Sequence, residues 1–385
     1  MVDAEISSRI GINYGRLGNN LPSAFQSIQI IQSMNAGRVK LYDANPEILK
    51  LLSGTKIHVS IMVPNHEIIS IASDQSIANK WVQDNVFQYY PDTMIRFILV
   101  GNEVLSCFSD QEKNIWLNLV PAMRRIKNSL RAQKIQNIKV GTPLAMDILQ
   151  TTFPPSKGNF RSDISSTVIV PLLKFLNGTK SFFFIDVYPY FAWSANPSNT
   201  SIDMALFKSN ENYTDPATGF VYTNLLDQML DSVIFAMTKL GFPDVRMTAK
   251  PPIGTPARPG EVIPTFIFSL YDENQKDGPG TERHWGLLNA NGAPIYDIDL
   301  TGNHLQSEYG PLPKPNNNDP YKEKLWCIAA RGADLMELDR ALDYAFSSYW
   351  AQFRSQGANC HFNGLAEQTT TNPSRGSCKF PSVTL

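Results

Sequence analysis

Short runs of β-branched and aromatic residues recur along the first 300 residues, and longer segments with helical periodicity separate them. Two of the runs, residues 96–101 and 181–186, are almost continuously apolar, which is typical of strands buried on both faces of a parallel sheet. Eight strands with helices between them predict a (β/α)8 (TIM) barrel, for which about 250 residues is a typical length. The predicted strands are residues 9–14, 38–42, 58–63, 95–100, 138–142, 182–188, 245–248 and 265–271, and helix-length segments include 76–89, 111–133 and 224–240.

An open, doubly wound sheet is the alternative fold, because it has the same alternation of strands and helices. Sheets of that kind commonly bind a nucleotide at a Gly-x-Gly-x-x-Gly turn after a strand. No such turn follows any predicted strand. The barrel is therefore the favoured interpretation.

Charge and hydropathy restrict the partners of the chain. The 34 basic and 35 acidic residues nearly cancel, leaving a net charge of −1, whereas nucleic acid or an acidic membrane would require a basic surface. No stretch reaches the roughly 18 apolar residues of a membrane span. We expect neither nucleic acid nor a membrane span, and no sequence motif predicts a metal or a cofactor.

Polar residues follow several predicted strands at the point where each strand ends, and in a barrel this face carries the chemistry. Glu103 is the strongest candidate for a catalytic residue, because the strand before it is almost wholly apolar. Burial raises the pKa of a carboxyl group, which suits a general acid. The alternative is a structural glutamate that accepts a hydrogen bond from a loop amide.

Aromatic residues gather after the sixth predicted strand, at Tyr188, Tyr190, Phe191 and Trp193. Aromatic faces cover the apolar CH patches of sugar rings, so this cluster suits a carbohydrate ligand. Plain packing of the barrel is the alternative explanation.

Six motifs occur in order over about residues 9–298: Gly11-Ile-Asn-Tyr-Gly-Arg, Val39-Lys-Leu-Tyr-Asp-Ala-Asn, Val100-Gly-Asn-Glu-Val, Asp186-Val-Tyr-Pro-Tyr-Phe, Gly254-Thr-Pro-Ala-Arg-Pro-Gly, and Asp272-Glu-Asn-Gln-Lys with Glu282-Arg-His-Trp-Gly-Leu. Together they resemble plant glycoside hydrolase family 17, the endo-β-1,3-glucanases. The resemblance implies a barrel with a groove along its C-terminal face and retaining hydrolysis of β-1,3-glucan. It also implies an extracellular or cell-wall location, although residues 1–10 show no apolar core of a secretory signal. We expect a monomer.

The resemblance assigns roles to residues by their place in the motifs. Glu103, in Gly-Asn-Glu-Val, is expected to be the general acid/base. Glu273, Lys276 and Glu282 match the charged group of the family's active site. The other residues expected to line the groove all end strands or follow them directly: Tyr14, Tyr42, Asp43, Asn102, Tyr188 and Phe191.

One family motif is missing. The family's nucleophile is the Glu of a Glu-Thr-Gly-Trp-Pro-Ser motif that ends the seventh strand, but residues 241–256 read Gly-Phe-Pro-Asp-Val-Arg-Met-Thr-Ala-Lys-Pro-Pro-Ile-Gly-Thr-Pro. A retaining glycosidase needs two carboxyl groups roughly 5–5.5 Å apart. Lys250 lies near the vacated place and cannot supply an anion. We expect Glu103 to lack its partner.

The same gap affects the predicted fold. A crossover between parallel strands takes about a dozen residues and normally includes a helix. Residues 251–264 contain five prolines, which prevent a helix. We therefore predict that the seventh helix and the nucleophile loop are missing and that one side of the barrel is thinly covered.

The remainder of the chain divides into a Pro/Asn-rich linker, residues 306–323, and a small module, residues 324–385, after a barrel of residues 1–305. The module resembles a family 43 carbohydrate-binding module in Trp326-Cys327-Ile-Ala and Cys360-His-Phe-Asn-Gly. It has three of the family's six cysteines, with the middle missing between Ala345 and Phe346. The resemblance implies a disulfide between Cys327 and Cys360.

Three hypotheses of different class follow. The chain is a working endo-β-1,3-glucanase in which another carboxylate, such as Glu273, acts as nucleophile. Alternatively, it is a non-catalytic protein that binds cell-wall β-1,3-glucan, or a truncated product that folds poorly. The absent glutamate of the seventh strand favours the second hypothesis over the first.

Overall fold

The computed structural model describes residues 10–106, 109–195, 197–198, 200–248, 254–261, 264–296 and 300, and the backbone of 324–325 and 380–381. Two units are distinguished, residues 1–311 and 312–385. In the second unit, β16 (Lys324–Leu325) pairs antiparallel with β17 (Phe380–Pro381). The predicted linker, Cys327, Cys360 and the rest of the predicted module lie outside the described residues.

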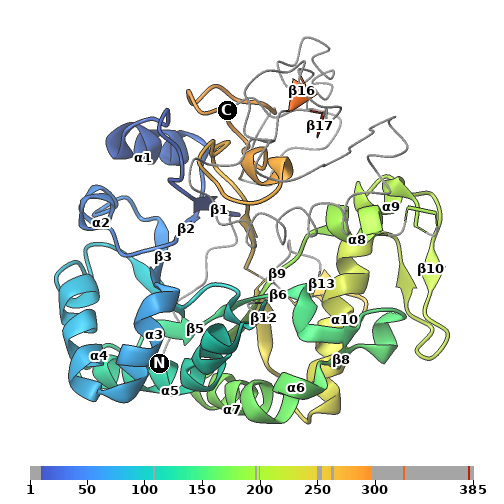
Figure 1. Ribbon diagram of the computed structural model, residues 1–385, viewed down its shortest axis with the longest axis horizontal. Helices are drawn as coiled ribbons and strands as arrows, with labels where there is room; N and C mark the ends of the chain where they lie inside the picture. The colour runs from blue at the N-terminus through green and yellow to red at the C-terminus, as the bar shows by residue number, and fades with distance from the viewer. Residues whose placement is uncertain are drawn as a thin grey trace, which may run out of the picture. The chain divides into compact units, whose positions relative to one another are not determined.

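Parallel strands form the centre of the first unit, and helices surround them (Figure 1). One sheet has the order β15-β1-β2-β3-β4-β5 and a second has the order β12-β9-β6. Only Thr142 separates β5 from β6, so the fifth predicted strand joins both sheets. All eight predicted strands are present, and the predicted α/β barrel architecture is confirmed. Their bounds are β1 Gly11–Tyr14, β2 Arg38–Leu41, β3 His58–Val63, β4 Ile95–Val100, β5 Lys139–Gly141, β9 Phe182–Asp186, β12 Arg246–Thr248 and β15 Phe266–Ile267. β6 (Pro143–Ala145) continues the chain directly after the fifth strand.

The outer helices begin where the sequence supplies capping residues. Ser23 and Gln26 form a capping box at α1 (Ala24–Ser33), and Asn224 caps α10 (Leu225–Lys239) through the amide of Asp227. Such caps satisfy amides that have no partner within the helix. The remaining helices are α2 (Pro46–Leu51), α3 (Ile68–Ser73), α4 (Gln75–Val82), α5 (Asp110–Ala132), α6 (Ser162–Ile164), α7 (Val170–Thr179), α8 (Pro189–Ala195) and α9 (Ile202–Ala205).

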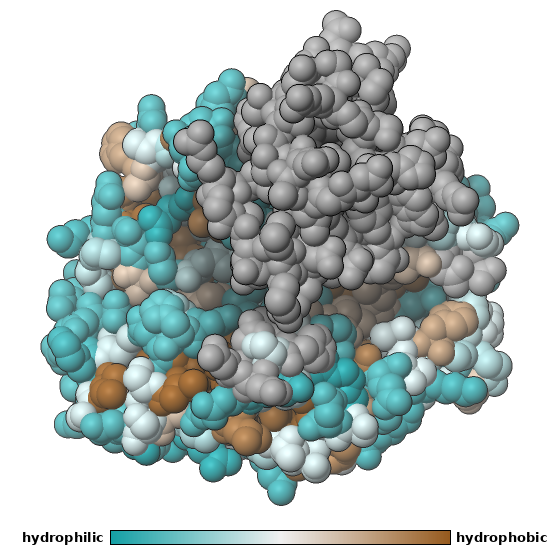
Figure 2. Space-filling model, in the orientation of Figure 1, coloured by the Kyte–Doolittle hydropathy of each residue, from teal (hydrophilic) through white to brown (hydrophobic). Residues whose placement is uncertain are grey.

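The barrel interior is filled by apolar side chains below the strand ends. Phe97 on β4 meets Phe182 and Phe184 on β9 edge to face, with ring centres 5.6 and 5.2 Å apart. Met62 and Leu99 complete this cluster. A larger core lies between the sheet and the helices. The visible outer face of the described residues is mostly hydrophilic, with separate hydrophobic patches (Figure 2).

The connection from β12 to β15 is short. Its described residues, 254–261 and 264–265, contain no helix and form only a hairpin of β13 (Gly254–Thr255) and β14 (Arg258–Pro259). The buried carboxylate of Asp231 on α10 accepts a hydrogen bond from the amide of Ala257 at 2.9 Å and holds the hairpin against the helix. Among the described residues no ladder joins β12 to β15. Because residues 249–253 and 262–263 are not described, the loss of the seventh helix stays a prediction.

Two further hairpins complete the first unit: β7 (Leu149–Thr151) with β8 (Asn159–Phe160), and β10 (Tyr213–Thr214) with β11 (Val221–Tyr222). No helix in the described part of the chain is long and apolar enough to cross a membrane.

Candidate active site

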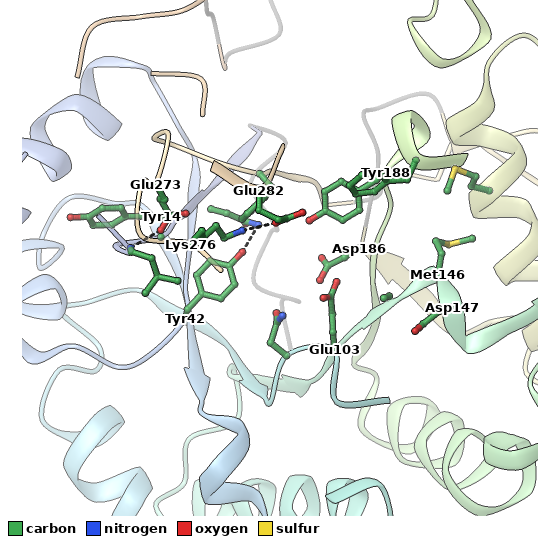
Figure 3. Close-up of a pocket in the computed structure, with 18 of the residues that line it drawn as sticks. Tyr14, Tyr42, Glu103, Met146, Asp147, Asp186, Tyr188, Glu273, Lys276 and Glu282 are labelled. Atoms are coloured by element: carbon green, nitrogen blue, oxygen red, sulfur yellow. Dashed lines mark hydrogen bonds and ion pairs between the residues drawn. The ribbon is translucent and has the colours of Figure 1, made fainter. Parts of the chain in front are cut away.

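A cleft of about 1180 Å³ opens at the C-terminal ends of the barrel strands. Its lining comes from the ends of β1, β2, β4, β6 and β9 and from the segment after β15, which lie far apart in the sequence (Figure 3). All ten residues that the sequence predicts for the site line this single cleft: Tyr14, Tyr42, Asp43, Asn102, Glu103, Tyr188, Phe191, Glu273, Lys276 and Glu282.

The turn after β4 fixes Glu103. Gly101 has φ +71° and Glu103 itself has φ +49°, so the chain turns sharply through the left-handed region. Asn65 holds this turn by accepting from the Asn102 amide at 2.7 Å and donating to the Asn102 carbonyl at 3.1 Å. The Glu103 amide donates to the Pro143 carbonyl at 3.0 Å. A strained backbone held by its neighbours in this way is typical of functional positions.

The Glu103 carboxyl faces the carboxyl of Asp186 at the end of β9 (Figure 3). Burial, and then the negative charge of Asp186, raise the pKa of Glu103 to about 7. Lys40, buried on β2, places its Nζ 3.7 Å from Oδ1 of Asp186. A glutamic acid with such a pKa is protonated over much of the range in which a general acid operates.

Two tyrosines close the cleft around this pair. The hydroxyl of Tyr42 accepts a hydrogen bond from Asn13 Nδ2 at 3.1 Å, which leaves its own proton available to the cleft. Burial, and then the charge of Asp186, raise the pKa of both Tyr42 and Tyr188. Both hydroxyls are therefore neutral donors at physiological pH.

Glu273, in the segment after β15, is buried. Its Oε1 accepts from the amide of Leu17 at 2.7 Å. A Cβ on Gly15 would lie 2.3 and 2.4 Å from the two carboxylate oxygens, so the lack of a side chain at Gly15 makes room for them. Burial raises the pKa of Glu273, against the lowering effect of the Leu17 amide and of Lys276.

Lys276 and Glu282 form an ion pair at 3.1 Å on the cleft wall (Figure 3). The Lys276 ammonium also lies 4.1 Å from the centre of the Phe268 ring, a cation–π geometry. Asp43 pairs with Arg16. Tyr14 is almost wholly buried and packs edge-on against Tyr271.

A connected cluster of aromatic rings includes Tyr188 and Phe191, which line the cleft. The ring of Tyr188 lies 5.5 Å from that of Phe191 and 5.3 Å from that of Trp285, while Tyr190 contacts Trp193 at 5.8 Å. Phe191 remains 39% exposed, so its face is available to a ligand. The four aromatic residues that the sequence suggests, Tyr188, Tyr190, Phe191 and Trp193, therefore pack as one connected cluster.

The sequence did not identify Lys40, Asp186 or Trp285 as site residues. Asp186 carried a usable signal, because it opens the Asp-Val-Tyr-Pro-Tyr motif at a strand end. Lys40 lies inside an expected strand. Trp285 lies 97 positions after Tyr188 in the chain, so the two rings meet only in the folded protein. Pattern alone therefore indicates neither residue.

The seventh strand contributes no acid. β12 consists of Arg246, Met247 and Thr248, and the next five residues in the sequence are Ala, Lys, Pro, Pro and Ile. Lys250 falls in this stretch, outside the described residues. Among the described residues no group of three or more His, Cys, Asp or Glu side chains is arranged to hold a metal ion.

The sequence model of glycosyl hydrolases family 17 matches the chain in two segments, residues 10–251 and 246–300. The chain belongs to this family. A probable glucan endo-1,3-beta-glucosidase A6 of Arabidopsis thaliana is 53% identical over 445 aligned positions, which cover 99% of this chain and 92% of the relative. A glucan endo-1,3-beta-D-glucosidase of Olea europaea is 30% identical, with 98% of this chain and 94% of the relative covered.

Solved structures of similar proteins agree with the fold. CJP38, a β-1,3-glucanase and pollen allergen of Cryptomeria japonica, superimposes with a TM-score of 0.73 at 34% identity, covering 77% of this chain and 100% of that one. One of two plant β-glucan endohydrolases gives 0.69 at 32% identity, covering 75% and 100%. Family membership and the barrel architecture expected from the sequence are confirmed.

Proposed function

We propose that the cleft binds β-1,3-glucan and that the chain hydrolyses this polymer poorly or not at all. The glucan follows from the family, whose curated relatives are glucan endo-1,3-β-glucosidases. The cleft has the features that such a ligand requires: an exposed aromatic face at Phe191, neutral tyrosine hydroxyls and a buried carboxylic acid. We place the protein outside the cell, in the wall where this polymer occurs, as a monomer.

One observation supports impaired catalysis above all: the seventh strand and the five residues after it contain no Asp or Glu. In retaining hydrolysis one carboxylic acid protonates the leaving oxygen while a second carboxylate attacks the sugar from the opposite face. Glu103 has the burial and the raised pKa of the acid. Proton transfer alone contributes typically about 10²–10⁴-fold, a small part of a glycosidase's acceleration.

The other carboxylates of the cleft are poorly placed to replace the nucleophile. Glu273 is buried, its Oε1 accepts the Leu17 amide, and both of its oxygens lie close to Gly15, so its carboxyl is already engaged at the end of β1. Asp186 faces Glu103 across the floor of the cleft and is held in an ion pair with Lys40 (Figure 3). Glu282 is held in its ion pair with Lys276.

The comparisons support two internal deletions. The family match restarts at residue 246, within its first segment, where the nucleophile motif would stand. The alignment with the Arabidopsis relative has 445 positions and this chain has 385 residues, so at least 60 positions of the relative have no counterpart here. We infer that the seventh helix with the nucleophile loop is absent, and that the family 43-like module of residues 324–385 is truncated.

Isothermal titration with β-1,3-linked glucose oligomers tests the binding proposal. We expect weak binding, with dissociation constants of about 1 mM or less. Phe191→Ala should lower the affinity. Phe25→Ala is the matched control, because Phe25 is an exposed aromatic residue on α1 that does not line the cleft. An absence of both heat and any shift in melting temperature at millimolar oligomer contradicts the proposal.

A further inference from the structure

Basic residues gather at the starts of the barrel strands, which is the end of the barrel opposite the cleft. Arg38 begins β2 and His58 begins β3, and the two are partners in the register of these parallel strands. Arg96 is the second residue of β4, at an irregular step in the ladder that joins β4 to β3. Three neighbouring strands therefore bring a basic side chain to the same end.

Arg38 points into the barrel. Side chains two positions apart on a strand lie on the same face, and Lys40 reaches Asp186 at the floor of the cleft from inside the barrel. The Arg38 residue is only 2% exposed. Its partner on β1 is Gly11, where a Cβ would lie 2.9 Å from the Cβ of Arg38. The lack of a side chain at Gly11 makes room beside Arg38.

The guanidinium groups at this end have unused donors. Within the described structure, Nε and Nη2 of Arg38 and Nε of Arg96 are buried and have no hydrogen-bond partner. Burial lowers the pKa of Arg38 to about 10, so its guanidinium is still charged at pH 7. A buried charge without a partner is strongly destabilising. An acceptor that carries negative charge is therefore needed at this position.

No carboxylate of the described residues fills this need, since none forms an ion pair with Arg38, His58, Arg96 or Arg246. Arg246 begins β12 at the same end, with its guanidinium carbon 4.3 Å from the centre of the Phe182 ring. Burial, and then the charges of Arg96 and Arg38, lower the pKa of His58 to about 4. His58 is therefore neutral at pH 7 and can donate one N–H to a ligand.

We propose that the N-terminal end of the barrel binds a small oxyanion, such as phosphate, between Arg38 and Arg96. A planar guanidinium matches oxyanions, because two parallel N–H groups can donate to two oxygens. The apolar cluster around Phe97 fills the barrel interior toward the cleft, so the site favours a small anion and is separate from the glucan cleft. The bound anion compensates the buried charge and stabilises the fold. This inference does not depend on the proposed function.

Titration calorimetry of the full chain with inorganic phosphate, at constant ionic strength, tests the proposal. We expect one saturable site per chain, for which sulfate competes. Arg38→Met should abolish binding, because it removes the buried guanidinium, and Arg96→Gln should weaken binding about tenfold. Arg124→Gln is the matched control, because Arg124 is an exposed arginine on α5 and its loss should leave the affinity unchanged.

Melting temperatures give a second measurement. Phosphate at ten times its dissociation constant should raise the melting temperature of the wild type by about 2–4 °C. Phosphate also stabilises proteins in general, because it is excluded from their surfaces, and Arg38→Met should gain only this smaller increment.

The absence of saturable phosphate binding overturns the proposal, and so does equal affinity in the wild type and Arg38→Met. If Arg38→Met does not fold, Arg96→Gln decides: a weaker affinity supports the site, and an unchanged affinity overturns it.

Discussion

Gly15 shows how one residue shapes the site. Its missing side chain makes room for Glu273, whose two oxygens would lie 2.3 and 2.4 Å from a Cβ at this position. The segment after β15 is thereby tied to the end of β1 through the Leu17 amide. A backbone position without a side chain thus decides where a carboxylate of the cleft can stand.

Gly15→Ala should destabilise the protein by about 1–3 kcal/mol, because Glu273 must move or lose the Leu17 amide. The matched control is Gly178→Ala in α7, where a Cβ meets nothing within 4 Å. That change should be neutral or stabilise by up to about 1 kcal/mol. Urea unfolding of the two variants measures both effects, and equal free energies of unfolding would rule out the packing argument.

Glu103 should also make stability depend on pH. Its pKa is raised from 4.5 to about 7 in the folded chain, so between these values the folded state binds the proton more tightly than the unfolded state. The free energy of unfolding should therefore fall by about 2–3 kcal/mol as pH rises through this window. Glu103→Gln should flatten this part of the profile. A variant profile that keeps the wild-type slope contradicts the raised pKa.

At the scale of elements, the hairpin of β13 and β14 stands where a crossover helix is expected. It is anchored on α10 by Asp231, which is fully buried and accepts from the Tyr222 hydroxyl and the Ala257 amide, both at 2.9 Å. Arg258 of the same hairpin also donates to the carbonyls of Val245 and Pro243, so Asp231 and Arg258 both anchor the connection to strand eight.

Asp231→Ala should cost about 2–4 kcal/mol, because it leaves the buried hydroxyl of Tyr222 and the half-buried amide of Ala257 without their acceptor. Asp84→Ala is the comparison, since it breaks only an exposed pair with Lys80 on one helix face and should cost less than about 0.5 kcal/mol. Thermal or denaturant unfolding gives both numbers. A cost for Asp231→Ala as small as that for Asp84→Ala would mean that the hairpin is not held this way.

The sequence predicted the strands well for a physical reason. Strands buried on both faces need continuous apolar runs, and β4 and β9 are such runs. Their C-terminal ends place Glu103, Tyr188 and Phe191 on the same face of the barrel. Helix limits were less accurate: the helix predicted for residues 76–89 ends as α4 at Val82 and continues as a π-helical turn over Gln83–Phe87. Lys40 and Trp285 escaped prediction because only long-range contacts reveal them.

At the scale of the whole molecule, the barrel strands form two sheets, β15-β1-β2-β3-β4-β5 and β12-β9-β6, and the described residues show no ladder between β12 and β15. The missing pairing between β12 and β15 favours the hypothesis of a product that folds poorly. The large core between sheet and helices argues for a folded barrel, so we expect one cooperative melting transition for residues 1–311. A melt without a cooperative transition would support the poorly folded product instead.

The most direct test of impaired catalysis is the release of reducing sugar from β-1,3-glucan by the chain and by Glu103→Gln. We expect both to be near background at every pH, because the described residues of the seventh strand place no carboxylate opposite Glu103. A chain in which a Glu-Thr-Gly-Trp-Pro-Ser segment and its helix are inserted after Met247 is the positive control, and its activity should depend on Glu103. Robust turnover by the chain as it stands, abolished in Glu103→Gln, would contradict the account and point to Glu273 as the nucleophile.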